Sequence, residues 1–248
     1  MPLEILDYES TPLGTLCLRR RELVSRPGTI VTEVTLDHEF LMSSYLTESE
    51  RALARIGLEK VSDHIEGKLN VLVGGLGLGY TANECLKSAR VASVEVVEFL
   101  PQVIGWLDRG LIPLAGQLAG DGRLNVTHGD VYARVAEEGV DSSKPGQNPI
   151  DQGTAERFDL IVIDVDHSPQ DVLGDQSHGF YTREGLRRTR EQLTVGGVLG
   201  VWSYAEDTPL LANLKEELVD VDVQQVTVWN DLIDVEQTDW LFFGRREA

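Results

Sequence analysis

Basic residues and cysteines are scarce in this chain of 248 residues. Its 41 acidic residues outnumber its 22 lysines and arginines, which gives a formal net charge of −19 at pH 7. Because such a chain repels phosphate groups, we expect no nucleic-acid partner, whereas a cationic ligand such as a polyamine or a sulfonium suits the charge. The two cysteines, Cys17 and Cys85, lie far apart in the sequence, which indicates reduced thiols rather than a metal site.

Long apolar runs and a leader pattern are missing as well. No apolar run approaches the roughly 20 residues that a membrane-spanning helix requires. The residues Met1–Ile5 do not show the basic and then apolar pattern of a secretory signal. The five histidines are scattered, so nothing favours a zinc site. We therefore expect a cytoplasmic protein that neither enters a membrane nor holds a metal.

A glycine-rich turn after an apolar strand is the most informative motif. Residues 70–82 read Asn-Val-Leu-Val-Gly-Gly-Leu-Gly-Leu-Gly-Tyr-Thr-Ala, which predicts a buried parallel strand, a tight turn and a helix start. Gly75, Gly77 and Gly79 carry no Cβ, so a ligand can lie against the backbone. Glu98 ends the next apolar run about 20 residues later, the spacing at which a carboxylate reaches a ribose. The motif therefore predicts a ligand of the adenosine type.

Strands and helices alternate along the rest of the chain, which predicts a parallel sheet with right-handed crossovers. We expect an α/β, Rossmann-like domain at 46–248 with a mostly parallel seven-stranded sheet. Its strands are expected at 69–73, 93–97, 124–127, 158–163, 197–202, 221–229 and 240–244. Its helices are expected at 47–61, 80–89, 101–109, 131–137, 182–193 and 208–218. Because few residues separate the last two strands, we expect an antiparallel hairpin there.

The first 45 residues predict a small antiparallel β unit. Strands are expected at 3–8, 14–18 and 29–36, joined by turns at 11–14 and 26–28. The sequence Thr47-Glu-Ser-Glu50 fits a capping box and predicts the start of the first helix. The polar segment 138–157 is expected to be a surface insertion.

Three carboxylates follow expected strands and are predicted to converge at one edge of the sheet: Glu98, Asp130 and Asp164. Asp130 is expected either to accept a hydrogen bond from an adenine amine or to cap the next helix. Asp164 ends a strongly apolar strand and is the strongest catalytic candidate, with a loop-bracing role as the alternative.

Four further residues are candidates for substrate contact. Asp166 and His167 lie in the loop 165–179, at the carboxyl end of a strand, where open α/β sheets bind ligands. Tyr204 follows the fifth expected strand of the large domain, and His38 lies between two elements of the β unit. For His38 a surface position is the default interpretation.

Two other nucleotide sites fit the motif less well. Gly77-x-Gly79-x-x-Ala82 matches a dinucleotide turn, but the chain has no Tyr-x-x-x-Lys pair and no second domain for a hydride acceptor. No lysine follows the glycines, so a nucleotide triphosphatase is not expected. A nucleoside sulfonium suits the pattern better.

These motifs resemble those of the spermidine and spermine synthases, the polyamine aminopropyltransferase family. The resemblance covers roughly residues 69–205, with a fainter echo at 8–45. It rests on the stretches Val71–Gly79, Val94–Ile104, Arg123–Asp130, Phe158–Asp164, Phe180–Gly185 and Leu193–Leu199.

The resemblance implies the fold of the class I S-adenosylmethionine-dependent methyltransferases, with the small β unit in front. It implies transfer of an aminopropyl group from decarboxylated S-adenosylmethionine to a small-molecule amine, and a homo-oligomer, either a homodimer or a tetramer. It also implies that Glu98 binds ribose, that Asp130 faces adenine and that Asp164 is catalytic.

Two departures from the family leave alternatives open. The family's turn usually carries an Asp that helps to hold the aminopropyl amine, and Leu78 takes its place here. The loop after Asp164 has one extra residue, so Asp166 or His167 must replace the family's second Asp. Leu78 also suits a methyltransferase, because S-adenosylmethionine carries a carboxylate that an Asp would repel. A degenerate protein that only binds an adenosyl ligand is the third interpretation.

Overall fold

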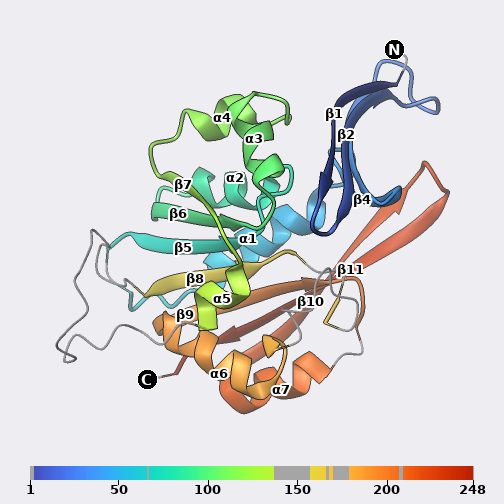
Figure 1. Ribbon diagram of the computed structural model, residues 1–248. Coiled ribbons are helices and arrows are strands. Elements are labelled where there is room, and N and C mark those ends of the chain that lie inside the picture. The colour runs from blue at the N-terminus through green and yellow to red at the C-terminus, as the bar shows by residue number, and fades with distance from the viewer. Residues whose placement is uncertain are drawn as a thin grey trace.

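The computed structural model describes residues 3–65, 67–136, 157–165, 168–169, 179–206 and 209–247. The chain forms a four-stranded sheet followed by a seven-stranded sheet with helices on both faces (Figure 1). The expected insertion at 138–157, except its last residue, and most of the loop 165–179 lie outside the described residues. None of the described helices is long and apolar enough to cross a bilayer.

The N-terminal sheet is an antiparallel meander in the order β1-β2-β3-β4. Its strands are β1 (Glu4–Thr11), β2 (Gly14–Glu22), β3 (Ile30–Leu36) and β4 (Glu39–Ser43). The three expected strands and both turns are confirmed, whereas β4 was not predicted. A two-residue turn at Asp37 and His38 joins β3 to β4, and both residues have positive φ angles. This is the backbone conformation of a type I′ turn. Such turns usually have the sequence Asn-Gly, and Asp37-His38 did not indicate one, so β4 was missed.

The large sheet has the order β10-β11-β9-β8-β5-β6-β7. Its strands are β5 (Leu69–Gly74), β6 (Val91–Glu98), β7 (Leu124–His128), β8 (Phe158–Ile163), β9 (Leu193–Ser203), β10 (Val219–Asn230) and β11 (Val235–Arg245). The pairs among β9, β8, β5, β6 and β7 are parallel, and β11 is antiparallel to both β9 and β10. The predicted mostly parallel, Rossmann-like sheet with a final hairpin is confirmed.

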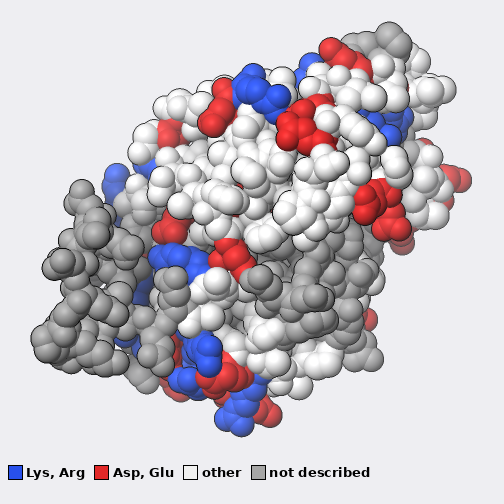
Figure 2. Space-filling model, in the orientation of Figure 1, with Lys and Arg blue, Asp and Glu red and all other residues white. Residues whose placement is uncertain are grey.

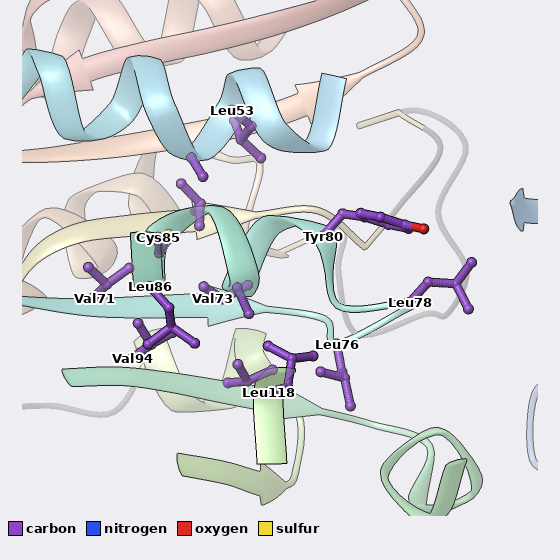
Figure 3. Packing of buried hydrophobic residues seen from close by; sticks show 14 of the residues in the cluster. Leu53, Val71, Val73, Leu76, Leu78, Tyr80, Cys85, Leu86, Val94 and Leu118 are labelled. Atoms are coloured by element: carbon purple, nitrogen blue, oxygen red, sulfur yellow. The ribbon is translucent and has the colours of Figure 1, made fainter. Parts of the chain in front are cut away.

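Helices cover both faces of this sheet. They are α1 (Glu48–Lys60), α2 (Tyr80–Lys87), α3 (Pro101–Asp108), α4 (Ala115–Ala119), α5 (Val131–Ala136), α6 (Arg183–Gln192) and α7 (Pro209–Glu217). Alternate residues of β8 face two separate cores: Leu160 and Val162 pack with residues of α1 to α4, and Ile161 and Ile163 pack with residues of α5 to α7. Figure 3 shows part of the first core between β5, α2 and α1.

The start of α1 differs from the predicted capping box. The Thr47 side chain makes no cap hydrogen bond to the helix backbone and instead accepts one from Arg51 Nε at 3.0 Å. Glu48, rather than Glu50, accepts the Thr47 N–H at 2.9 Å. The side chain of Glu50 therefore does not take the capping-box position at the start of α1.

Two sets of contacts join the N-terminal unit to the large domain. On β1, Asp7 accepts hydrogen bonds from Trp106 Nε1 at 2.6 Å and from Arg109, both on or next to α3. At the tip of the β10–β11 hairpin, Asp231 contacts the Tyr45 hydroxyl and pairs with Arg26. Figure 1 shows this hairpin reaching toward the N-terminal sheet. These contacts connect β1 to the region of α3 and the β10–β11 hairpin to the N-terminal unit.

Candidate functional site

A cavity of about 800 Å³ lies between the two units. Its walls come from β2 to β4, the first turn of α1, the glycine turn after β5, the ends of β8 and β9, and the β10–β11 hairpin. The predicted residues Gly75, Gly77, Gly79 and Asp164 line it. A volume of this size is typical of a site for a small organic ligand.

The glycine turn runs along one wall of the cavity. Gly75, Gly77 and Gly79 all have positive φ angles, which explains why residues without Cβ occur there. Figure 3 shows Leu76 and Leu78 leaving this turn in different directions, and both are buried. The turn thus lines the cavity with its glycine backbone and with parts of both leucines.

Gly75 also sets how closely the turn approaches the catalytic candidate. A Cβ at this position would lie 2.8 Å from the backbone oxygen of Asp164. Gly75→Ala is expected to destabilise the protein by about 1–2 kcal/mol through the left-handed backbone, and to displace Asp164 besides. Gly28→Ala is the control, because Gly28 has the same φ of +89° but nothing within 4 Å of an added Cβ. Thermal melts should shift for both variants, and a loss of ligand binding should follow only from Gly75→Ala.

Three carboxylates from separate elements meet in the cavity: Asp164 follows β8, Glu50 lies in the first turn of α1, and Asp239 lies in β11. Thr81 Oγ1 donates a hydrogen bond to Asp164 Oδ2 at 2.8 Å, and Ser49 Oγ donates one to Glu50 Oε2 at 3.2 Å. Within the described part of the chain, no lysine or arginine forms an ion pair with any of the three carboxylates. The part of the cavity next to Asp164 therefore concentrates acidic side chains.

The carboxylates in this cluster hold protons more tightly than usual. Burial raises the pKa of Glu50 to about 8, and the charge of Asp164 adds to the rise. Burial raises the pKa of Asp164 to about 6. The hydrogen bond from Thr81 lowers this pKa, and the negative charge of Asp239 raises it further. Burial also raises the pKa of Asp239. Near neutral pH the cluster therefore retains at least one proton, which a bound cation would displace.

Neither Glu50 nor Asp239 was a predicted site residue. The capping-box pattern assigned Glu50 to the helix terminus, and Asp239 lies in a strand that no motif marks. A carboxylate between Thr238 and Trp240, in a run that otherwise becomes apolar, was the available signal for Asp239. Their proximity to Asp164 depends on how the first and last elements pack against β8, which a local pattern does not contain.

Glu98 stabilises the glycine turn from its buried side. It is 7% exposed and is not among the described residues that line the cavity. Its Oε2 accepts the Leu76 N–H and its Oε1 accepts the Leu100 N–H, each at 2.8 Å. Burial raises its pKa, and backbone hydrogen bonds, including one from Gly77, oppose the rise. The carboxylate is thus directed at the turn backbone.

The other predicted residues occupy separate places. Asp130 Oδ1 accepts the Tyr132 N–H at 2.8 Å, the geometry of the helix-cap alternative for α5. His38 is an exposed turn residue of the N-terminal sheet, and Tyr204 is half exposed after β9. Neither is among the described cavity-lining residues. Asp166 and His167 lie outside the described residues.

Trp202 adds a polar group to the cavity wall. Its indole Nε1 is buried next to Asp239 and lowers the pKa of that carboxyl against the effect of burial, as does the Ser49 hydroxyl. Among the described residues, no three His, Cys, Asp or Glu side chains are arranged to hold a metal.

The amino-acid sequence was compared with family profiles and with the sequences of known proteins. No known family profile matches the chain. A polyamine aminopropyltransferase from Prochlorococcus marinus (strain NATL2A) is 29% identical over 139 residues. The match covers 56% of this chain and 41% of the relative, so the chain spans less than half the length of that protein.

Comparison of structures agrees on the fold. A spermidine synthase in complex with the transition-state analogue AdoDATO matches with a TM-score of 0.71 at 14% identity, over 98% of this chain and 74% of that one. The spermidine synthase from Thermotoga maritima matches with a TM-score of 0.69 at 14% identity, over 98% and 72%. Human methyltransferase-like protein 13 in complex with SAH matches with a TM-score of 0.55 at 19% identity, over 81% and 83%. The fold is that of the S-adenosylmethionine-dependent methyltransferases with an added N-terminal β unit, and in sequence the chain is similar to a polyamine aminopropyltransferase.

Proposed function

We propose that this protein transfers an aminopropyl group from decarboxylated S-adenosylmethionine to an amine. The observation that carries the proposal is the cluster of Glu50, Asp164 and Asp239 in one cavity beside the glycine turn. Both the sulfonium donor and a protonated amine acceptor are cations, and no lysine or arginine among the described residues forms an ion pair with this cluster. The relationship to the aminopropyltransferases and the adenosyl-type ligands of the matched structures support the same reaction.

The chemistry requires alignment and one deprotonation. The amine nitrogen forms a bond to the methylene carbon next to the sulfonium, the C–S bond breaks, and methylthioadenosine leaves with the electron pair. Asp164, whose pKa of about 6 makes it a base near neutral pH, accepts the proton that the acceptor ammonium must lose before its nitrogen can attack. Thr81 fixes the orientation of this carboxylate. The turn at 75–79 supports the nucleoside so that the reactive carbon faces the amine.

A methyltransferase is the rival function, and the match to a methyltransferase-like protein gives it some support. S-adenosylmethionine carries a carboxylate that its decarboxylated form lacks. Because Glu50, Asp164 and Asp239 would repel that carboxylate, the acidic cluster favours the decarboxylated donor. The third candidate, an adenosyl-binding protein without activity, makes no use of the raised pKa of Asp164.

One set of measurements separates the three functions. Calorimetry compares the binding of methylthioadenosine, S-adenosylmethionine and the decarboxylated form, and mass spectrometry then looks for products with a panel of amines. We expect preference for the decarboxylated form and a product that is heavier than the acceptor by one aminopropyl group. Preference for S-adenosylmethionine with a methylated product would replace our proposal, and binding without any product would support the inactive protein.

Glu98 is the test of the nucleoside half of the site. Glu98→Ala leaves the buried N–H groups of Leu76 and Leu100 without their acceptor, which is expected to cost about 1–3 kcal/mol of stability for each group that stays unpaired. Because the turn loses its support, affinity for methylthioadenosine should fall as well. Glu95→Ala is the control on the same strand, since Glu95 makes only a partly exposed ion pair with Arg134 at 3.1 Å. Unchanged calorimetric affinity in Glu98→Ala would exclude a role for Glu98 in ligand binding.

A further inference from the structure

Two arginines face the same cavity from the N-terminal sheet. Arg19 and Arg21 lie two residues apart on β2, so their side chains share one face, and both line the cavity. Arg20, between them, points to the other face, where its guanidinium reaches the backbone oxygen of Leu111 at 3.4 Å. The acidic cluster thus has a basic counterpart on a different wall.

A buried carboxylate holds this arginine pair in place. Glu33 lies opposite Arg19 on β3, and its side chain is only 4% exposed. Its Oε2 accepts a hydrogen bond from Arg19 Nε and its Oε1 accepts one from Arg21 Nε, each at 2.9 Å. Burial would raise the pKa of Glu33, but hydrogen bonds from Arg21 and Arg19 outweigh burial and lower it. Glu33 is therefore ionised, and both guanidinium groups are fixed in orientation.

Arg19 and Arg21 together carry more positive charge and more N–H donors than Glu33 can pair with. Two guanidinium groups share a single carboxylate, so one positive charge remains uncompensated. The arginine side chains are 33% and 34% exposed, and beyond Glu33 neither meets another acceptor among the described residues. Guanidinium groups bind carboxylates through paired N–H donors, and prior fixation lowers the entropic cost of doing so.

We propose that Arg19 and Arg21 form a carboxylate subsite, so that the acceptor is an amine that also carries a carboxylate rather than a diamine. The inference rests on the proposed aminopropyl transfer. The ammonium of such an acceptor lies by Glu50, Asp164 and Asp239, while its carboxylate lies by the two arginines. A diamine places its second ammonium against the guanidinium groups, where like charges repel.

The test compares two acceptors on the same four-carbon spacer, 1,4-diaminobutane and 5-aminopentanoate. Decarboxylated S-adenosylmethionine is the donor, and the full chain is used. We expect kcat/KM for 5-aminopentanoate to exceed that for the diamine by about tenfold or more. Arg21→Gln should lower it by about 10- to 100-fold, mainly through KM, because a charged hydrogen-bonding partner is lost. Arg20→Gln is the control and should change neither value.

A second variant and a binding measurement complete the test. Arg19→Gln and Arg21→Gln each leave Glu33 with one arginine, so a folding defect in one variant does not prevent the comparison with the other. If the wild-type protein transfers nothing to any acceptor, the proposed reaction fails, but the subsite is still examined by titrating 5-aminopentanoate into the protein saturated with methylthioadenosine. Heat of binding that disappears in the arginine variants supports the subsite, and its absence from the wild-type protein overturns it.

Two other outcomes also overturn the inference. A preference for the diamine that the arginine variants leave unchanged would show that the pair only supports the N-terminal sheet. Weaker binding of S-adenosylmethionine in the same variants, with no change for the decarboxylated donor, would assign the arginines to the carboxylate of the donor rather than that of the acceptor.

Discussion

The Asp164→Asn protein is expected to bind methylthioadenosine with native affinity and to transfer the aminopropyl group about 10²- to 10⁴-fold more slowly. Asparagine keeps the shape of the side chain and an oxygen that can accept the hydrogen bond from Thr81, which lies at 2.8 Å in the wild-type protein. It cannot accept the proton that the acceptor ammonium must lose before its nitrogen attacks. Single-turnover measurements with quenched samples report the chemical step, and calorimetry reports binding.

A matched substitution on the same strand separates catalysis from stability. Asp159 lies near the start of β8, where its carboxylate accepts hydrogen bonds from the Asn70 N–H at 2.8 Å and from Thr194 Oγ1 at 2.7 Å. Asp159→Asn should lower the melting temperature and leave the rate constant of the folded protein unchanged. If Asp164→Asn behaves in the same way, then Asp164 braces its loop and the base is another residue.

The sequence predicted the large domain well because its signals are local. Apolar runs such as Leu69–Gly74 and Phe158–Ile163 read as buried strands, and the helical segments between them leave few ways to order a parallel sheet. The short connection between β10 and β11 likewise required an antiparallel pair. The ends of some strands differ from the prediction because pairing with a neighbouring strand determines them. One example is β9, which pairs with β8 and begins at Leu193, four residues before the expected start.

The site was predicted less completely because its charges come from distant parts of the chain. Gly75, Gly77, Gly79 and Asp164 were identified from a motif of consecutive residues, and all four line the cavity. Glu98 was identified by the same motif, but its carboxylate contacts the backbone of the turn, which depends on the conformation of the turn rather than on sequence spacing. The acidic cluster and the arginine pair required the packing of the N-terminal sheet against the large domain.

The surface explains why net charge alone did not reveal the cavity. On the face shown in Figure 2, acidic and basic side chains are interspersed rather than gathered into one patch. Inside the cavity, burial raises the pKa values of Glu50 and Asp164, so these carboxyl groups differ from the acidic residues on the surface.

Glu50→Gln is expected to stabilise the protein at alkaline pH and to leave its stability unchanged in acid. The carboxyl of Glu50 has a pKa near 4.5 in the unfolded chain and about 8 in the folded one. Below pH 4.5 it is neutral in both states. As the pH rises toward 8, the unfolded chain releases its proton and the folded chain retains it, so the contribution of this group to stability is progressively lost. A glutamine never ionises and avoids this loss.

With a folded pKa of about 8 against 4.5 in the unfolded chain, the expected gain from Glu50→Gln at about pH 9 is roughly 4–5 kcal/mol, or roughly 8–20 °C in melting temperature. Glu48→Gln is the control in the same helical turn, because the Glu48 side chain is exposed. Melting curves of the three proteins from about pH 4 to pH 9 measure the effect. A Glu50→Gln curve parallel to that of the wild-type protein would mean that the carboxylate is solvated and lies outside the cluster.

The same substitution should reverse its effect when an amine is bound. An ammonium ion next to Glu50 and Asp164 replaces the proton that they retain, so wild-type affinity for a cationic acceptor should increase as the pH rises toward 8, up to the point where the amine itself loses its charge. Glu50→Gln should weaken this affinity and flatten its pH dependence. The instability that Glu50 causes in the empty protein at high pH is then the free energy that the bound cation recovers, as expected of a binding site that is built at the expense of stability.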